Sequence, residues 1–178
     1  MHVPPPPSAH HAFDLRLFLQ HFSPTPRGAR LARILVEQQL HEWGIPYDSE
    51  TSQAAVTIVA ELAANAVTHG FVPGRDFRVG ILVTSAPRVR IEVSDRRGDR
   101  LPLLPPCAAG SDCESGRGLK LVTALADCWG VLRWAGPVPG KTVWAEVSRR
   151  EPEPDGRAVA EAPGTGRTPP AGNGERGR

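Results

Sequence analysis

The segment from Glu61 to Gly70, ELAANAVTHG, constrains this chain more than any other part of it. Most of its residues are apolar and favour a helix, but Glu61, Asn65 and His69 recur four residues apart. At 3.6 residues per turn, these three side chains share one stripe of the helix while the other faces are apolar. An unpaired polar group in a protein interior costs about 1–3 kcal/mol. The stripe therefore faces either solvent or a polar ligand in a cleft.

The polar atoms of this stripe indicate what such a ligand contains. Glu61 and Asn65 offer oxygen acceptors and a single amide group. Hard oxygen ligands of this kind suit Mg²⁺ that is carried by the phosphates of a nucleotide. A nucleotide with Mg²⁺ is one prediction for this helix, and a solvated helix face is the alternative.

The chain has 178 residues, and both of its ends differ in composition from its centre. Residues 1–11 include four consecutive prolines, and residues 150–178 are rich in Pro and Gly without any aromatic residue, Leu or Ile. Such segments cannot bury enough apolar surface to offset chain entropy, so we predict two disordered tails. One folded domain is expected over residues 12–149.

Charge, hydropathy and cysteine content exclude several classes of protein. The formal net charge of +2 is too small to indicate a nucleic acid or a membrane surface as a partner. No apolar run is long enough for a transmembrane helix and no secretion signal begins the chain, so we expect a cytoplasmic protein. Cys107, Cys113 and Cys128 lack metal-ligand spacing and are expected to be reduced thiols, with a Cys107–Cys113 disulfide switch as the alternative.

Periodicity predicts two helices in the first half of the domain. Residues 13–19 mix alternation with a short apolar run, which indicates an edge strand or the start of the fold. Thr25 followed by Pro26 is typical of a helix start, and Gly44 ends that helix. A second helix, over about residues 48–70, carries the polar stripe.

A period of two follows, which indicates strands. The predicted elements are an antiparallel hairpin over residues 77–84 and 89–94, a helix over 118–127, and strands over 130–134 and 142–147. Residues 96–117 contain so many Gly and Pro that we expect a loop there, which is either a functional lid or disordered. The sum is an α+β domain, a two-layer α/β sandwich with a mixed, mostly antiparallel sheet and three helices on one face.

Two short patterns at strand ends have candidate binding roles. Asp95 ends a predicted strand shortly before Gly98, where a carboxylate can accept a hydrogen bond from an exocyclic amine, although Asp also starts many ordinary turns. Thr142 begins the last predicted strand. Its hydroxyl would complete a pocket for a base, although Thr in a strand needs no special explanation.

A glycine-rich turn opens the third predicted helix. Gly116 and Gly118 let backbone N–H groups approach an anion, the helix dipole favours negative charge, and Arg117 adds a cation. Glycine for steric reasons is the alternative. The turn is neither a Rossmann fingerprint nor a Walker A loop, because no strand precedes it and no G-x-x-x-x-G-K-[ST] occurs.

The order of these patterns resembles the GHKL superfamily of ATP-binding domains and, within it, the anti-sigma-factor serine kinases of the RsbW and SpoIIAB type. The resemblance covers residues 13 to 147. Glu61 to Gly70 is similar to the N box of that family, which implies that Asn65 binds Mg²⁺, that Glu61 is the general base, and that His69 lies near phosphate or simply ends the helix. Asp95 corresponds to the aspartate that contacts the amino group of adenine.

The remaining motifs follow in the order that the family has. Residues 116–119, which are Gly116, Arg117, Gly118 and Leu119, look like its G2 box. Thr142 resembles a threonine of the closing strand that lies near the adenine. The chain departs from the pattern after Asp95, since Arg97 stands where the family usually has glycine and Gly98 comes one residue later.

The resemblance implies the Bergerat ATP-binding fold, ATP and Mg²⁺ as cofactors, and serine/threonine protein kinase activity. The implied partners are an anti-anti-sigma protein of the STAS type and an RNA polymerase sigma factor, and a homodimer is expected. The alternative is a nucleotide-gated partner-binding protein that transfers no phosphate, which the shifted glycine motivates. A third interpretation is a domain that no longer binds ATP.

Overall fold

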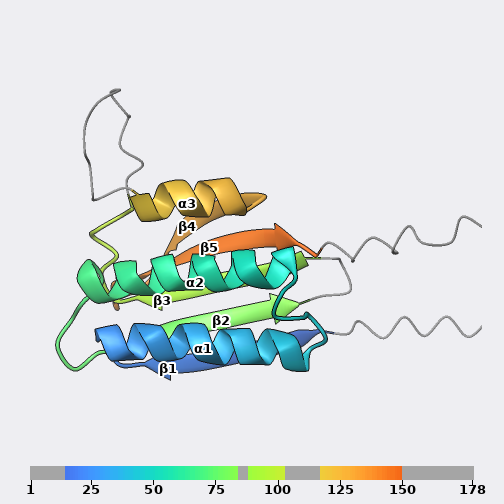
Figure 1. Cartoon of the computed structure of the whole chain (residues 1–178). Helices are drawn as coiled ribbons and strands as arrows, with labels where there is room; N and C mark the ends of the chain where they lie inside the picture. The colour runs from blue at the N-terminus through green and yellow to red at the C-terminus, as the bar shows by residue number, and fades with distance from the viewer. Residues whose placement is uncertain (1–14, 84–87, 103–116, 150–178) are drawn as a thin grey trace, which may run out of the picture.

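The computed structural model of the chain describes residues 15–83, 88–102 and 117–149. Within these ranges the chain forms five strands and three helices (Figure 1). In chain order they are β1 (Arg16–Phe22), α1 (Pro26–Glu42), α2 (Glu50–Thr68), β2 (Phe77–Val83), β3 (Arg88–Asp95), α3 (Arg117–Leu125), β4 (Cys128–Arg133) and β5 (Lys141–Ser148). Every predicted helix and strand is present, with small shifts at its ends.

The five strands form one sheet in the order β1-β2-β3-β5-β4. All four neighbouring pairs of described strands are antiparallel, so the prediction of a mixed sheet is wrong in that respect. The reason is the connection through α3: the chain returns to the far edge as β4 and then turns back as β5, which enters between β4 and β3 and runs opposite to both. β1 is an edge strand, as one reading of residues 13–19 predicted.

The helices cover one face of the sheet, as expected. Phe18, Ile81, Ile91 and Ala145 are cross-strand neighbours on the covered face, where Ile81, Ile91 and Ala145 are fully buried. In Figure 1 the three helices lie on the same side of the sheet, with α2 between α1 and α3. α2 contacts β2, β3 and β5, so this helix is the centre of the helical layer.

Capping side chains fix where the first two helices begin. Thr25 accepts a hydrogen bond from the backbone N–H of Gly28 at 3.1 Å, and Ser49 accepts one from Ser52 at 3.2 Å. Each such cap stabilises a helix by about 1 kcal/mol. The start of α1 at Pro26 confirms the prediction from Thr25-Pro26. The φ angle of +79° at Gly44 suits the residue that follows the helix.

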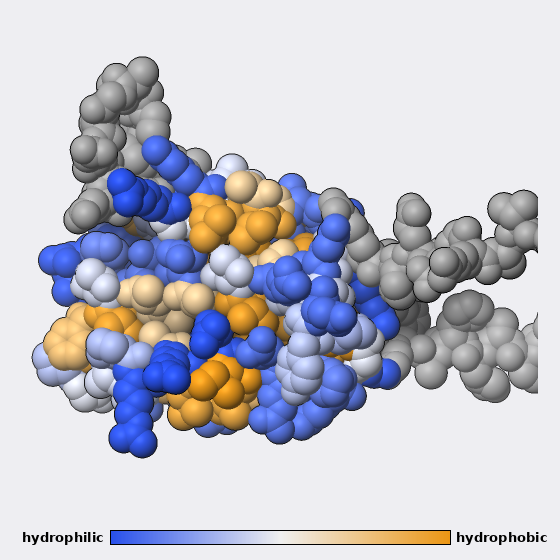
Figure 2. Space-filling model, in the orientation of Figure 1, coloured by the Kyte–Doolittle hydropathy of each residue, from blue (hydrophilic) through white to orange (hydrophobic). Residues whose placement is uncertain are grey.

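Several apolar side chains remain on the surface. Figure 2 shows hydrophobic patches over α1 and α3, and the exposed residues there include Leu31, Ile34 and Leu121. On the uncovered face, Leu17 and Leu19 of β1 are exposed as well. None of the helices in the described part of the chain is long and apolar enough to cross a membrane.

Some predictions fall on residues that the structure does not describe. Both predicted tails, most of the predicted lid, and Cys107 with Cys113 lie outside the described ranges. The limits of the domain at residues 12 and 149 and the roles of these segments therefore stay predictions.

Candidate functional site

Glu61 and Asn65 lie one turn apart on α2, and both are half-buried. Their neighbours Ile58, Leu62 and Ala66 are buried in the core and fix the orientation of the helix. Within the described ranges no hydrogen bond or ion pair satisfies either polar side chain. Two polar groups that are half withdrawn from water and have no partner among the described residues are suited to bind a ligand.

The carboxylate of Glu61 lies against the start of α3. A Cβ atom on Gly118 would come within 2.5 Å of Glu61 Oε2, which is closer than real side chains approach. Only glycine therefore fits at position 118 while Glu61 keeps this position. Glu61 and Gly118 belong to the two strongest motifs and are 57 residues apart in the sequence, and the fold thus brings them together.

The end of α2 lies against the predicted base-binding aspartate. A Cβ atom on Gly70 would come within 2.5 Å of Asp95 Cγ and 2.7 Å of the backbone oxygen of Ala66. Gly70 was not predicted to be a site residue, although it ends the same motif as Glu61. His69 caps α2 through its backbone and is exposed, which fits the helix-end interpretation of this residue.

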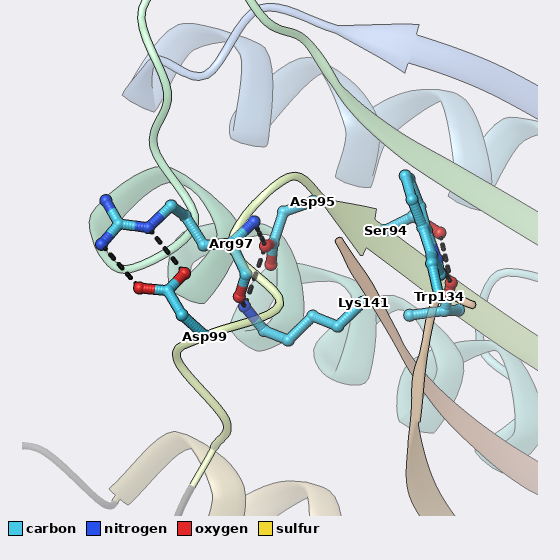
Figure 3. Close-up of polar contacts among 7 residues, drawn as sticks. Ser94, Asp95, Arg97, Asp99, Trp134 and Lys141 are labelled. Carbon is cyan, nitrogen blue, oxygen red and sulfur yellow. Dashed lines mark hydrogen bonds and ion pairs between the residues drawn. The ribbon is translucent and has the colours of Figure 1, made fainter. Parts of the chain in front are cut away.

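Asp95 ends β3 and is buried together with Lys141, the first residue of β5. Lys141 Nζ donates a hydrogen bond to Asp95 Oδ1 at 2.8 Å, and the side chains of both residues are only 6% exposed (Figure 3). The backbone N–H of Arg97 donates to the same oxygen at 2.8 Å. Lys141 was missed as a site residue. The pairing of Asp95 with Lys141 is set by the register between β3 and β5, and no local pattern in the sequence could have revealed it.

The turn after Asp95 is held by Lys141 through the backbone of Arg97. The backbone oxygen of Arg97 accepts a hydrogen bond from Lys141 Nζ at 2.8 Å, while the guanidinium turns away and pairs with Asp99 (Figure 3). The hydrogen bond from Arg97 lowers the pKa of the exposed Asp99 carboxyl below its ordinary value. A Cβ on Gly98 would lie 2.7 Å from the backbone oxygen of Gly140, so Gly98 permits close contact with the start of β5.

Thr142 does not lie with Asp95. Its hydroxyl lies 2.8 Å from that of Ser94 and accepts a hydrogen bond from Trp134 Nε1 at 3.0 Å. Successive residues of a strand point to opposite faces of the sheet, so Ser94 and Thr142 share the face opposite to Asp95 and Lys141. The expected role of Thr142 in a base pocket has no support from this arrangement.

The other residues of the predicted phosphate-binding turn are placed in different environments. Arg117 begins α3 and is exposed, whereas Leu119 is buried in the core and anchors the helix. Gly116 lies outside the described residues. The start of α3 therefore combines an anchored helix, an exposed cation and the contact of Gly118 with Glu61.

The described residues are suited to bind a metal ion that arrives together with a nucleotide, and not one held by protein side chains alone. They contain no group of three or more His, Cys, Asp or Glu side chains that would hold a metal by themselves. The side-chain oxygen atoms of Asn65 and Glu61 offer the hard ligands that Mg²⁺ prefers, and Mg²⁺ in nucleotide sites takes few protein ligands. Asn65 is therefore the residue that would hold Mg²⁺, and the metal would supply positive charge beside the phosphates.

A separate groove of about 480 Å³ lies near the beginning of α2. Its lining residues come from the first turns of α2, from α3 and from the end of β5, and include Thr51, Leu121 and Ser148. None of the predicted site residues lines it. The candidate site is therefore defined by the contacts around Glu61 and Asp95 and not by this groove.

Comparison with known proteins identifies a family and two solved structures of similar fold. Residues 22–146 match the family described as the histidine kinase-like ATPase domain. The RsbU and RsbW domains of Rv1364c from Mycobacterium tuberculosis superpose with a TM-score of 0.55 at 20% identity, over 75% of this chain and 32% of that chain. A chain of the SiaB–SiaC complex from Pseudomonas aeruginosa gives 0.54 at 12% identity, over 73% of this chain and 89% of the other.

No curated protein matches this sequence. This chain spans about a third of the Mycobacterium tuberculosis chain with the RsbU and RsbW domains, and at these identities both similarities establish the fold alone. The family match, in contrast, covers most of the chain and includes α2, the Asp95 turn and the start of α3. The protein therefore belongs to the family of histidine kinase-like ATPase domains, whose ATP-binding fold the resemblance in its motifs predicted.

Proposed function

We propose that this protein binds ATP with Mg²⁺ and phosphorylates a serine or threonine of a regulatory partner protein. The observation that carries the proposal is the contact of Glu61 with Gly118, because it joins the candidate general base to a candidate phosphate-binding turn. The contact of Gly70 with Asp95 supports the proposal, because Asp95, the candidate contact for adenine, then lies at the end of the same helix as Glu61. The end of α2, the turn after Asp95 and the start of α3 would thus surround a single nucleotide.

The proposed roles follow from the chemistry of each side chain. Asn65 would hold Mg²⁺, the backbone N–H groups at the start of α3 with Arg117 would bind phosphate oxygens, and Asp95 would accept a hydrogen bond from the adenine amine. Glu61 would take the proton from the hydroxyl of the partner's serine. The serine oxygen then bonds to the γ-phosphorus as the bond to ADP breaks. Half-burial of Glu61 favours this role, because a base next to a reacting hydroxyl must be shielded from competing water.

A protein of the STAS type is the proposed substrate, and a sigma factor is the proposed second partner. The similarity to an RsbW domain and to a chain of the SiaB–SiaC complex motivates this choice, together with the resemblance of the N box to that of anti-sigma-factor kinases. We also propose a cytoplasmic location, where ATP and the transcription machinery are available, and a homodimer.

One alternative has a specific observation in its favour. Asp95 is already engaged by Lys141 and by the backbone of Arg97, so the turn differs from one that opens onto a nucleotide through a glycine. A protein that uses ATP only to control its affinity for a partner would tolerate this difference more readily than a kinase. Its expected behaviour is ATP binding without any modified partner.

Incubation of the protein with Mg-ATP and purified STAS proteins tests the two functions. The kinase function predicts phosphoserine or phosphothreonine on one STAS protein, detected by mass spectrometry. Glu61→Gln should reduce transfer by about 100-fold or more, the size typical of general base catalysis, and should leave ATP affinity within a few-fold. Glu42→Gln removes an exposed carboxylate from α1 and serves as the matched control. ATP binding with no transfer to any partner would favour the gated binder instead.

A further inference from the structure

Lys141 and Asp95 form a buried ion pair at the point where the glycine pattern of this chain departs from that of its family. They are direct cross-strand partners at the ends of β5 and β3, on the face of the sheet that the helices cover. Removing one partner of a buried ion pair leaves an uncompensated charge, which is strongly unfavourable. The two residues therefore form one unit.

The hydrogen bonds of this unit leave a specific acceptor unused. Lys141 Nζ and the backbone N–H of Arg97 both donate to Oδ1 of Asp95. Among the described residues no donor reaches Oδ2, and this oxygen is not among the fully buried atoms that lack a partner. A carboxylate can accept about four hydrogen bonds, so Oδ2 keeps its full capacity while its direction is fixed through Oδ1.

The same ammonium group also shapes the turn. Lys141 Nζ binds the backbone oxygen of Arg97, the residue at the position where the family usually has glycine. The oxygen of Arg97 thus points inward to the lysine while its side chain points outward to Asp99 (Figure 3). Lys141 thus binds both the carboxylate of Asp95 and the backbone of the turn that follows it. This is the turn in which Arg97 replaces the expected glycine.

We propose that Lys141 is a positioning residue for nucleotide recognition: it fixes the carboxylate of Asp95 so that Oδ2 accepts a hydrogen bond from the exocyclic amine of the base. This inference rests on the proposed binding of ATP. It adds that the preference for adenine, a purine with an exocyclic amine, depends on Lys141, although Lys141 makes no contact with the base.

Calorimetric titration with Mg-ATP and Mg-ITP tests the proposal, because the base of ITP has a keto oxygen in place of the amine. We expect the wild-type protein to bind ATP at least about tenfold more tightly, the effect of one hydrogen bond to a charged group. Lys141→Met should bring this ratio to within about threefold of unity while ITP still binds. Lys141→Arg, which retains the cation, should recover part of the preference. Arg149→Met, after the opposite end of β5, is the matched control and should bind like the wild type.

The outcomes test the role of Lys141 separately from the binding of ATP. If the wild-type protein prefers ATP and Lys141→Met keeps the full preference, or binds ATP more tightly, the positioning role of Lys141 is wrong while ATP binding stands. If the wild-type protein binds neither nucleotide, the proposed function itself fails. Binding of ITP by Lys141→Met shows that the variant is folded. Should that variant not fold, Lys141→Gln replaces it and is expected to lose the preference in the same way.

Discussion

Glu61 on α2 and Gly118 on α3 are in such close contact that a single added methyl group would meet the carboxylate, at 2.5 Å from Oε2. The atom that would have to move is the end of a flexible side chain and not part of the backbone. The contact therefore controls where Glu61 lies more than it controls the stability of the fold.

Gly118→Ala is predicted to separate catalysis from stability. The methyl group should displace the Glu61 carboxylate, and a displacement of about 1 Å in a catalytic group costs about 100-fold in rate. Stability should not fall, because alanine is favoured over glycine in a helix by about 1 kcal/mol. Phosphate transfer to a STAS protein and urea unfolding measure the two effects. Unchanged transfer in a folded Gly118→Ala protein would contradict the role of Glu61 as the base.

Gly70→Ala is predicted to destabilise the domain. Its methyl group would come within 2.5 Å of Asp95 Cγ and 2.7 Å of the backbone oxygen of Ala66, and the latter cannot move without distorting α2. Overpacking of this kind costs about 1–3 kcal/mol in the free energy of unfolding. Thr68→Ala, at the exposed end of α2, is the control and should change stability much less. Wild-type stability of Gly70→Ala would mean that α2 and Asp95 are less closely packed than in this structure.

Thr142→Val is predicted to affect stability but not nucleotide affinity. The change removes the acceptor for Trp134 Nε1 and the hydroxyl that pairs with Ser94, at a cost of about 1 kcal/mol per hydrogen bond in the free energy of unfolding. Because Thr142 lies on the opposite face from Asp95, ATP affinity should stay within about twofold. A large loss of ATP affinity in a stable Thr142→Val protein would restore the role in base binding that the sequence predicted.

The contribution of Glu146 to stability is predicted to depend on pH. A hydrogen bond from Arg90 at 2.9 Å, opposed by desolvation, lowers the pKa of Glu146 from its ordinary value of 4.5. A lowered folded-state pKa gives stability that is present above about pH 4.5 and is lost as the pH falls through the folded pKa. Glu146→Gln should therefore cost about 0.5–1 kcal/mol near pH 7 and little in strong acid.

Urea unfolding at several pH values measures this difference. Glu42→Gln is again a suitable control, because Glu42 is exposed and hydrogen-bonds only neutral glutamine side chains among the described residues. The free energies of unfolding of Glu146→Gln and the wild type are compared at pH 3 and pH 7. If they differ by the same amount at both pH values, the ion pair with Arg90 is not the cause of the difference.

The sequence by itself determined the elements and the face of α2 that is polar. Thr25 with Pro26 marked the start of α1, alternation marked the four later strands, and the spacing of Glu61 and Asn65 placed both on one stripe. These signals are local, because capping and the repeat of 3.6 or 2 residues depend only on residues close together in the chain.

Only the tertiary structure decided which polar groups meet. Lys141 and Thr142 are adjacent in the sequence, yet the first binds Asp95 and the second binds Ser94 on the other face. The physical reason is the pleat of the strand, by which a shift of one residue exchanges the two faces of the sheet. The register between β3 and β5 joins residues that are 46 apart, so no local pattern specifies it.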